Sequence, residues 1–85
     1  VRDSIDGALL DIATFYRDVM MVQSGSVDAI INTDMADVIG KYAASHPKHT
    51  TIEKMSAIME ARTNLSHNAA PLLTCEALMC RLAKA

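Results

Sequence analysis

The chain has 85 residues, a formal net charge of −2 at pH 7 and a hydrophobic content of 51%. This length suits one small domain, which buries only about 60% of the surface of its unfolded chain. Aromatic residues make up 4% and tryptophan is absent, so a core must be built from aliphatic side chains. The basic residues are not clustered densely enough for a nucleic-acid-binding surface. No uncharged apolar run approaches the ~20 residues of a membrane-spanning helix.

The segment 8–22 is the part around which we expect the fold to be organised. Read at helical spacing, it has two apolar stripes and one narrow polar stripe, the latter formed by Asp3, Gly7, Asp11, Thr14 and Asp18. A helix that is apolar over most of its circumference is normally buried by several neighbours. We therefore predict a central helix over 4–23, ended by Gly25 in a left-handed conformation.

Within this helix the pattern also predicts individual environments. Ile12 and Tyr16 lie where the apolar stripes meet the expected core. Asp11 and Asp18 lie on the polar stripe. We expect the first pair to be internal and the second pair to be solvated.

The remaining segments predict shorter helices with short connections. Thr50 and Glu53 match a capping box at the start of one helix, and Pro71 suits the first turn of another because its missing N–H costs nothing there. We predict an all-α bundle of four main helices, with a short helical turn at 27–31 and further helices at 34–44, 50–67 and 71–84.

Side chains that could carry chemistry are few and scattered: His46, His49, His67, Cys75 and Cys80. No cysteine lies near the loop histidines, and the two cysteines lack the short separation of structural zinc sites. Five residues apart on one helix, they point about 140° from each other and cannot pair within it. We expect free thiols in a cytoplasmic setting, with no metal, no cofactor and no catalytic site.

Asn68 lies at the predicted turn between the last two helices. An Asn at such a turn commonly bonds backbone groups across the break, so we expect a structural role. From residues alone the chain is predicted to be a cytoplasmic helical domain that binds another protein.

The last third of the chain carries a longer pattern. Residues 61–83 contain a helix with Arg and Leu, a turn that ends in Pro, and a second leucine-rich helix, with key positions at Leu65, Asn68, Pro71, Leu73, Glu76 and Leu78. This pattern resembles the C-terminal signature of bacterial DNA polymerase III clamp-loader subunits. The segment 15–20, Phe-Tyr-Arg-Asp-Val-Met, looks like the aromatic-Leu-Arg-Asp-Leu-Leu segment of the delta-prime subunit. The segment 31–34, Ile-Asn-Thr-Asp, is similar to the turn that follows it there.

The sequence departs from that signature at two positions. Ala70 stands where the signature has a second Asn, and Leu72 stands where it has a basic residue. These departures leave delta-prime, the related gamma/tau subunits and a paralogue open. The segment 15–20 makes delta-prime the best fit.

The resemblance implies that residues 1–85 are the helical collar domain at the C-terminal end of a longer ATPase-fold subunit. A collar packs against the collars of the other loader subunits, gamma/tau and delta, while the loader places the sliding clamp on DNA for replication. The ATP sites belong to the preceding domains of such subunits. The domain itself would not be an enzyme, would hold no cofactor and would make no direct DNA or membrane contact, although its parent subunit belongs to a DNA-directed DNA polymerase holoenzyme.

The central helix has more apolar surface than a small bundle is expected to cover. We therefore predict that Val19, Met21 and Val22 lie nearer a subunit interface. The alternative is a stand-alone helical protein-interaction or regulatory domain, since function does not follow from fold. A small thiol or metal enzyme that uses Cys75 or Cys80 is a third hypothesis.

Overall fold

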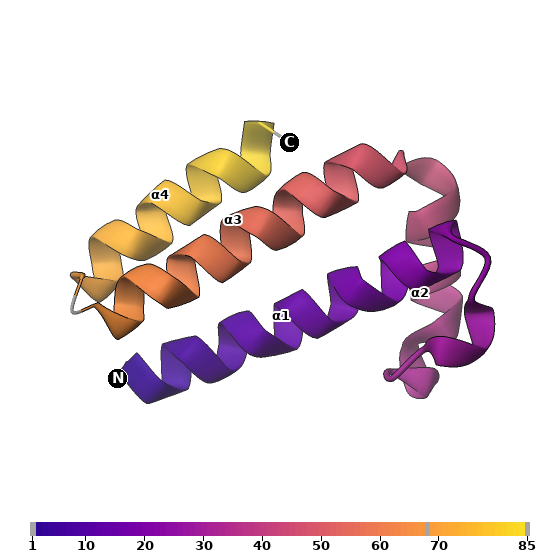
Figure 1. The fold of residues 1–85 in the computed structure, drawn as a ribbon, viewed down its shortest axis with the longest axis horizontal. Coiled ribbons are helices and arrows are strands. Elements are labelled where there is room, and N and C mark those ends of the chain that lie inside the picture. The colour runs from indigo at the N-terminus through magenta and orange to yellow at the C-terminus, as the bar shows by residue number, and fades with distance from the viewer. Residues whose placement is uncertain (1, 68, 85) are drawn as a thin grey trace.

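A computed structural model describes residues 2–67 and 69–84, and these residues form helices joined by short turns (Figure 1). No strand occurs among them. The predicted all-α fold is therefore confirmed, and each predicted helix bound agrees within two residues. The elements are α1 (Arg2–Gln23), the 3₁₀ turns η1 (Val27–Ala29) and η2 (Thr33–Met35), α2 (Ala36–Ser45), α3 (Lys48–Ser66) and α4 (Pro71–Lys84).

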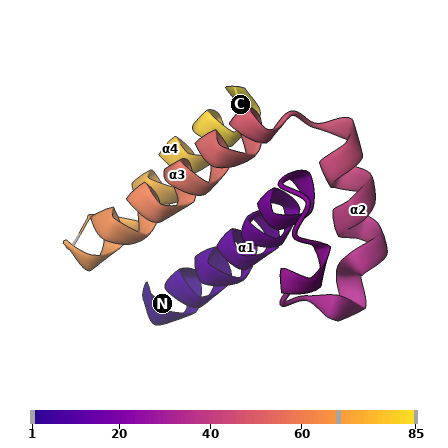
Figure 2. The same cartoon turned by 45° about the vertical axis from the view of Figure 1, so that its right-hand side comes forward.

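Helix α3 lies between α1 and α4, and α2 crosses the far end of α1 at a steep angle (Figures 1 and 2). Helix α1 packs against α3 and α2, whereas α4 packs chiefly against α3. The molecule measures 37 × 24 × 16 Å, so its shortest dimension is less than half its longest. So thin an arrangement leaves large parts of the outer helix faces uncovered.

The core is aliphatic, as the composition predicts, and it forms where α1, α3 and α4 meet. Small side chains let the helices approach closely, and larger ones fill the space between them. The buried cluster consists of Leu9, Ala13, Ala57, Ile58, Ala61, Leu65 and Leu78. Four of these seven residues come from α3, which is why α3 is the middle helix.

Helix α1 ends as the sequence predicts. Gly25 has a φ of +86°, in the left-handed region that only glycine adopts without strain. The Ser26 N–H donates to the Met21 carbonyl at 2.8 Å, and the Gly25 N–H donates to the Val22 carbonyl at 3.0 Å. This pair of hydrogen bonds is a Schellman motif, which satisfies the last carbonyls of the helix.

The predicted capping box at the start of α3 is wrong. The helix begins two residues earlier, at Lys48, and extended Pro47 precedes it without a side-chain cap. The Thr50 hydroxyl donates backward to the Pro47 carbonyl at 2.8 Å, because Thr50 already lies inside the first turn. Glu53 therefore does not occupy the third helical position that a capping box requires.

The predicted environments of α1 are partly reversed. Val19 is fully buried, whereas Ile12 is 40% exposed. The C-terminal half of α1 is covered by α2 and η1 as well as α3, while its N-terminal half lies against α3 (Figure 1). Burial along α1 is therefore set by how many neighbours each half has, which the periodic pattern does not encode. Tyr16 is half-buried against the core.

An aromatic cluster joins the three helices at the covered end. The rings of Phe15, Tyr16 and Tyr42 meet edge to face, with centroids 5.5–5.9 Å apart. The His46 ring stacks on Tyr42 at 3.9 Å. From α3, the Lys54 ammonium donates to the Tyr42 hydroxyl at 2.6 Å and lies over that ring. Side chains from α1, α2 and α3 thus hold this corner together.

Replacement of Ile58 by Ala should destabilise the chain by about 2–5 kcal/mol, because it removes a fully buried side chain from the middle helix. Urea unfolding followed by circular dichroism would measure the loss. The neighbouring variant Met59→Ala is the control, because Met59 is 47% exposed and should cost less than about 1 kcal/mol. An equal decrease in the free energy of unfolding of the two variants would contradict the assignment of Ile58 to the core.

Candidate functional site

The carboxylate of Asp18 is fully buried beneath the connection between α1 and α2. Its Oδ1 accepts the Ile31 N–H at 3.0 Å, and its Oδ2 accepts both the Asn32 N–H and the Asn32 side-chain amide at 2.8 Å. The Arg17 guanidinium donates to Oδ1 at 3.3 Å and to the Ala29 carbonyl at 3.2 Å. One charged group therefore fixes the course of the chain between η1 and η2.

This environment stabilises the ionised form of Asp18. Burial raises the pKa of a carboxyl group. The N–H donors of Ile31 and Asn32 outweigh that effect, with a smaller contribution from Arg17, so the pKa of Asp18 lies below its ordinary value of 3.8. A carboxylate held by donors in this way acts as a structural clamp, because it has no free lone pair directed at solvent.

The expectation that Asp18 is solvated is therefore wrong, and it is the residue that sequence reasoning missed. The polar stripe of α1 is continuous along the helix, but its last member lies under the 27–35 connection. Asn32 precedes the turn η2 but makes no side-chain cap hydrogen bond to it, and instead donates its side-chain amide to Asp18. The only sequence signal was the pairing of segments 15–20 and 31–34 in the resemblance. Asp11 is exposed, as predicted.

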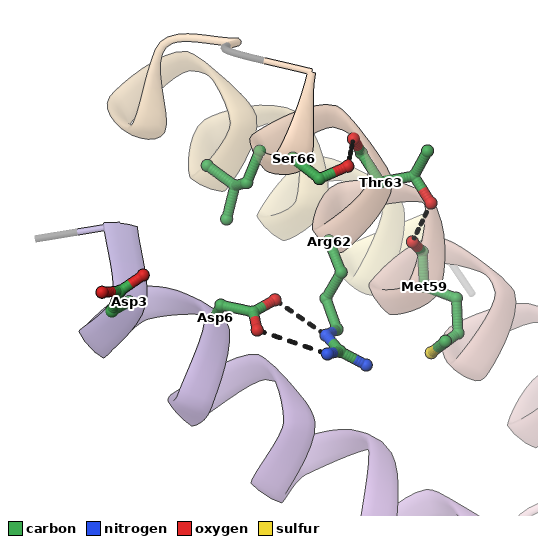
Figure 3. Close-up of a pocket in the computed structure, with 7 residues that line it drawn as sticks. Asp3, Asp6, Met59, Arg62, Thr63 and Ser66 are labelled. Atoms are coloured by element: carbon green, nitrogen blue, oxygen red, sulfur yellow. Dashed lines mark hydrogen bonds and ion pairs between the residues drawn. The ribbon is translucent and has the colours of Figure 1, made fainter.

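A surface hollow of about 530 Å³ lies between the start of α1 and the end of α3 (Figure 3). Arg62 pairs with Asp6 across it, through contacts of 2.8 and 3.2 Å. The hydrogen bond from Arg62 holds the pKa of Asp6 below its ordinary value. This pair ties the N-terminal half of α1 to α3.

Four polar side chains around this hollow already have hydrogen-bond partners: Asp6, Arg62, Thr63 and Ser66. The Thr63 hydroxyl donates to the Met59 carbonyl at 3.1 Å, and the Ser66 hydroxyl donates to the Thr63 carbonyl at 2.7 Å. Figure 3 shows these bonds and places Asp3 apart from the Asp6–Arg62 pair. The hollow therefore lacks the convergent free polar groups that orient a small ligand.

His, Cys, Asp and Glu side chains, which are possible metal ligands, occur throughout residues 2–67 and 69–84. Those residues contain no group of three His, Cys, Asp or Glu side chains placed to hold a metal ion. Cys75 is half-buried, Cys80 is exposed, and both thiols are free. None of the described helices is long and apolar enough to cross a membrane.

Exposed apolar side chains are the most prominent surface feature. Among the side chains that the structure describes, ten large apolar ones are at least 38% exposed, namely Leu10, Ile12, Ile31, Met35, Val38, Ile52, Met59, Leu72, Leu73 and Met79. The three most exposed by this measure are Leu72, Leu73 and Met79, at 65–70%, and all three are on α4. Large exposed apolar side chains gathered on one helix are typical of a protein–protein contact.

The exposure of these three side chains follows from the way α4 packs on α3. Pro71 is its first residue, as predicted, and Thr74 and Leu78 are its buried side chains. Both side chains face α3. An ion pair between Arg81 of α4 and Glu60 of α3 also joins the two helices. Leu72, Leu73 and Met79 project from the other side of α4, away from Leu78. We name this outward side, with Glu76 and Cys80, the α4 face.

The predicted interface residues lie elsewhere. Val19 is fully buried, so its expected place near an interface is wrong. Met21 and Val22 are half-buried, and their role in an interface stays a prediction.

The α4 face could have been predicted from the sequence, because its apolar residues extend beyond the single stripe that one neighbour can cover. Asn68, predicted as a structural turn residue, lies outside the described residues.

Comparisons of the chain with protein-family models, with curated proteins and with solved structures found no match. A functional proposal must therefore be argued from the arrangement of the residues and from the motif resemblance.

Replacement of Asp18 by Asn should destabilise the chain by about 2–4 kcal/mol, because it removes a buried charge that three N–H donors satisfy. The control is Asp11→Asn on the exposed part of the same polar stripe, which should change stability by less than about 0.5 kcal/mol. Denaturant unfolding of the two variants would check this. A free energy of unfolding of Asp18→Asn equal to that of the wild type would contradict the structural role assigned to the Asp18 carboxylate.

The contribution of Asp18 to stability should depend on pH. Because the folded pKa lies below the ordinary value of 3.8, the stabilisation is present above that value and is lost as the pH falls through the folded pKa. The difference in unfolding free energy between wild type and Asp18→Asn should be constant above about pH 5 and should narrow below about pH 4. A difference that grows on acidification would contradict the assigned protonation state.

Proposed function

We propose that this chain is an assembly domain, the collar domain of a bacterial DNA polymerase III clamp-loader subunit, with delta-prime as the best fit. It would pack against the collars of gamma/tau and delta, and so hold the loader together while the clamp is placed on DNA. The observation that carries the proposal is the α4 face, with three large apolar side chains 65–70% exposed on a helix that has one main neighbour. Such a face gains stability when another protein covers it.

The positions of the resembling segments add support. Asp18 belongs to segment 15–20 and binds residues of segment 31–34, so the two form one structural unit. In the third segment, Leu65 and Leu78 are buried and Pro71 begins α4. Asp18, Leu65, Pro71 and Leu78 of the motif therefore have structural roles within the domain.

The proposal assigns no chemistry to these residues. ATP binding would belong to preceding domains of the subunit, and DNA would be contacted by other parts of the loader. The compartment would be the cytoplasm, which suits two free thiols.

Native mass spectrometry of the full-length subunit with its loader partners would test the proposal, and the expected result is a complex that contains this chain. The double variant Leu72→Asp and Met79→Asp should weaken that complex by at least about tenfold, because it places charges in an apolar contact. Leu10→Asp is the control, since Leu10 is also an exposed leucine, at 46%, but lies on α1. Failure of the wild-type protein to enter the complex would refute the proposed function and favour a stand-alone interaction domain.

A further inference from the structure

A single carboxylate lies at the centre of the α4 face. Glu76 is exposed, and its neighbours at i−4, i−3, i+3 and i+4 are Leu72, Leu73, Met79 and Cys80. Residues at these separations adjoin one another on a helix surface. All four neighbours are exposed as well, so Glu76 is surrounded on its own helix by open apolar surface.

Glu76 has no ion-pair or hydrogen-bond partner among the described residues. Arg81 on the flank of the helix is paired with Glu60 of α3. Lys84 lies eight residues further on, about 12 Å along the helix axis. The charge of Glu76 is therefore available to whatever covers the α4 face.

The central position of this charge disfavours a second copy of the chain as the occupant. In a two-fold dimer each protomer uses the same patch, and an axis through the centre of the face brings the two Glu76 carboxylates together. Like charges in a closing apolar interface are repulsive, and neither would find a counter-ion. An occupant with the opposite charge would satisfy Glu76 and still cover the leucines.

We infer that the α4 face docks an amphipathic helix of a different protein, and that this helix presents an Arg or Lys to Glu76 within an apolar surface. Leu72, Leu73 and Met79 contribute area, while Glu76 fixes the register and rejects helices with an acid at that place. The inference rests on the proposed assembly role of this face and adds the chemistry by which the face selects its partner.

Two synthetic amphipathic peptides would serve as probes. They should have about 20 residues, so that helix formation is not limiting, and should differ only by an Arg or a Glu at the centre of a leucine face. Fluorescence anisotropy with the full chain should show the Arg peptide binding at least about tenfold more tightly than the Glu peptide. The variant Glu76→Arg should reverse that preference. The variant Glu53→Arg makes the same charge change at an exposed site of α3. It should keep the preference for the Arg peptide.

Equal binding of the two peptides, or binding of neither, would overturn the inference. Analytical ultracentrifugation provides an independent readout, because Glu76→Leu should self-associate at concentrations where wild type stays monomeric. A wild-type dimer that Leu72→Asp dissociates would assign the face to a second copy and would also overturn the inference. Circular dichroism would verify that each variant is folded.

These experiments separate the inference from the proposed function. A clear Arg preference in a chain that fails to join loader subunits would refute the clamp-loader assignment and retain the docking chemistry. Assembly with loader subunits that is unchanged by Glu76→Arg would support the assignment and refute the selective role of Glu76.

Discussion

The exposed side of α4 follows from one constraint: among the described residues, α3 is the one main helical neighbour of this helix. Its buried side chains, Thr74 and Leu78, fasten it to the middle helix, and the Arg81–Glu60 pair lies beside them. The apolar residues on its other side have nothing in the described chain to cover them. Since burial of apolar surface is the main favourable term in association, the simplest use of that surface is to bind another protein.

The opposite end of the molecule is built differently. There Asp18 binds the connection between α1 and α2 through N–H donors, and the aromatic cluster around Tyr42 joins α1, α2 and α3. This end is fixed by directional polar contacts and ring packing, whereas α4 is held to α3 by two buried side chains, Thr74 and Leu78, and by the Arg81–Glu60 pair. The fold thus combines a corner held by directional contacts with an exposed apolar face on α4.

The sequence predicts the helices well because each has a local physical cause, such as Gly25 at the end of α1 and Pro71 at the start of α4. It predicts environments less well. Asp18 and Asp11 occupy the same polar stripe, yet one is buried and the other exposed, because the 27–35 connection folds over one end of α1. Val19 and Ile12 are misplaced for a related reason, since helical spacing gives the direction of a side chain but not the number of neighbours it meets.

The central claim is that α4 has an open face which an assembly covers, and amide hydrogen exchange tests it directly. In the isolated chain the α4 amides should exchange faster than those of α3, because few of its side chains are buried. On addition of the loader partners, the protection of α4 should rise by more than that of α1. Protection of α4 equal to that of α3 in the isolated chain, and unchanged by every partner added, would contradict the account.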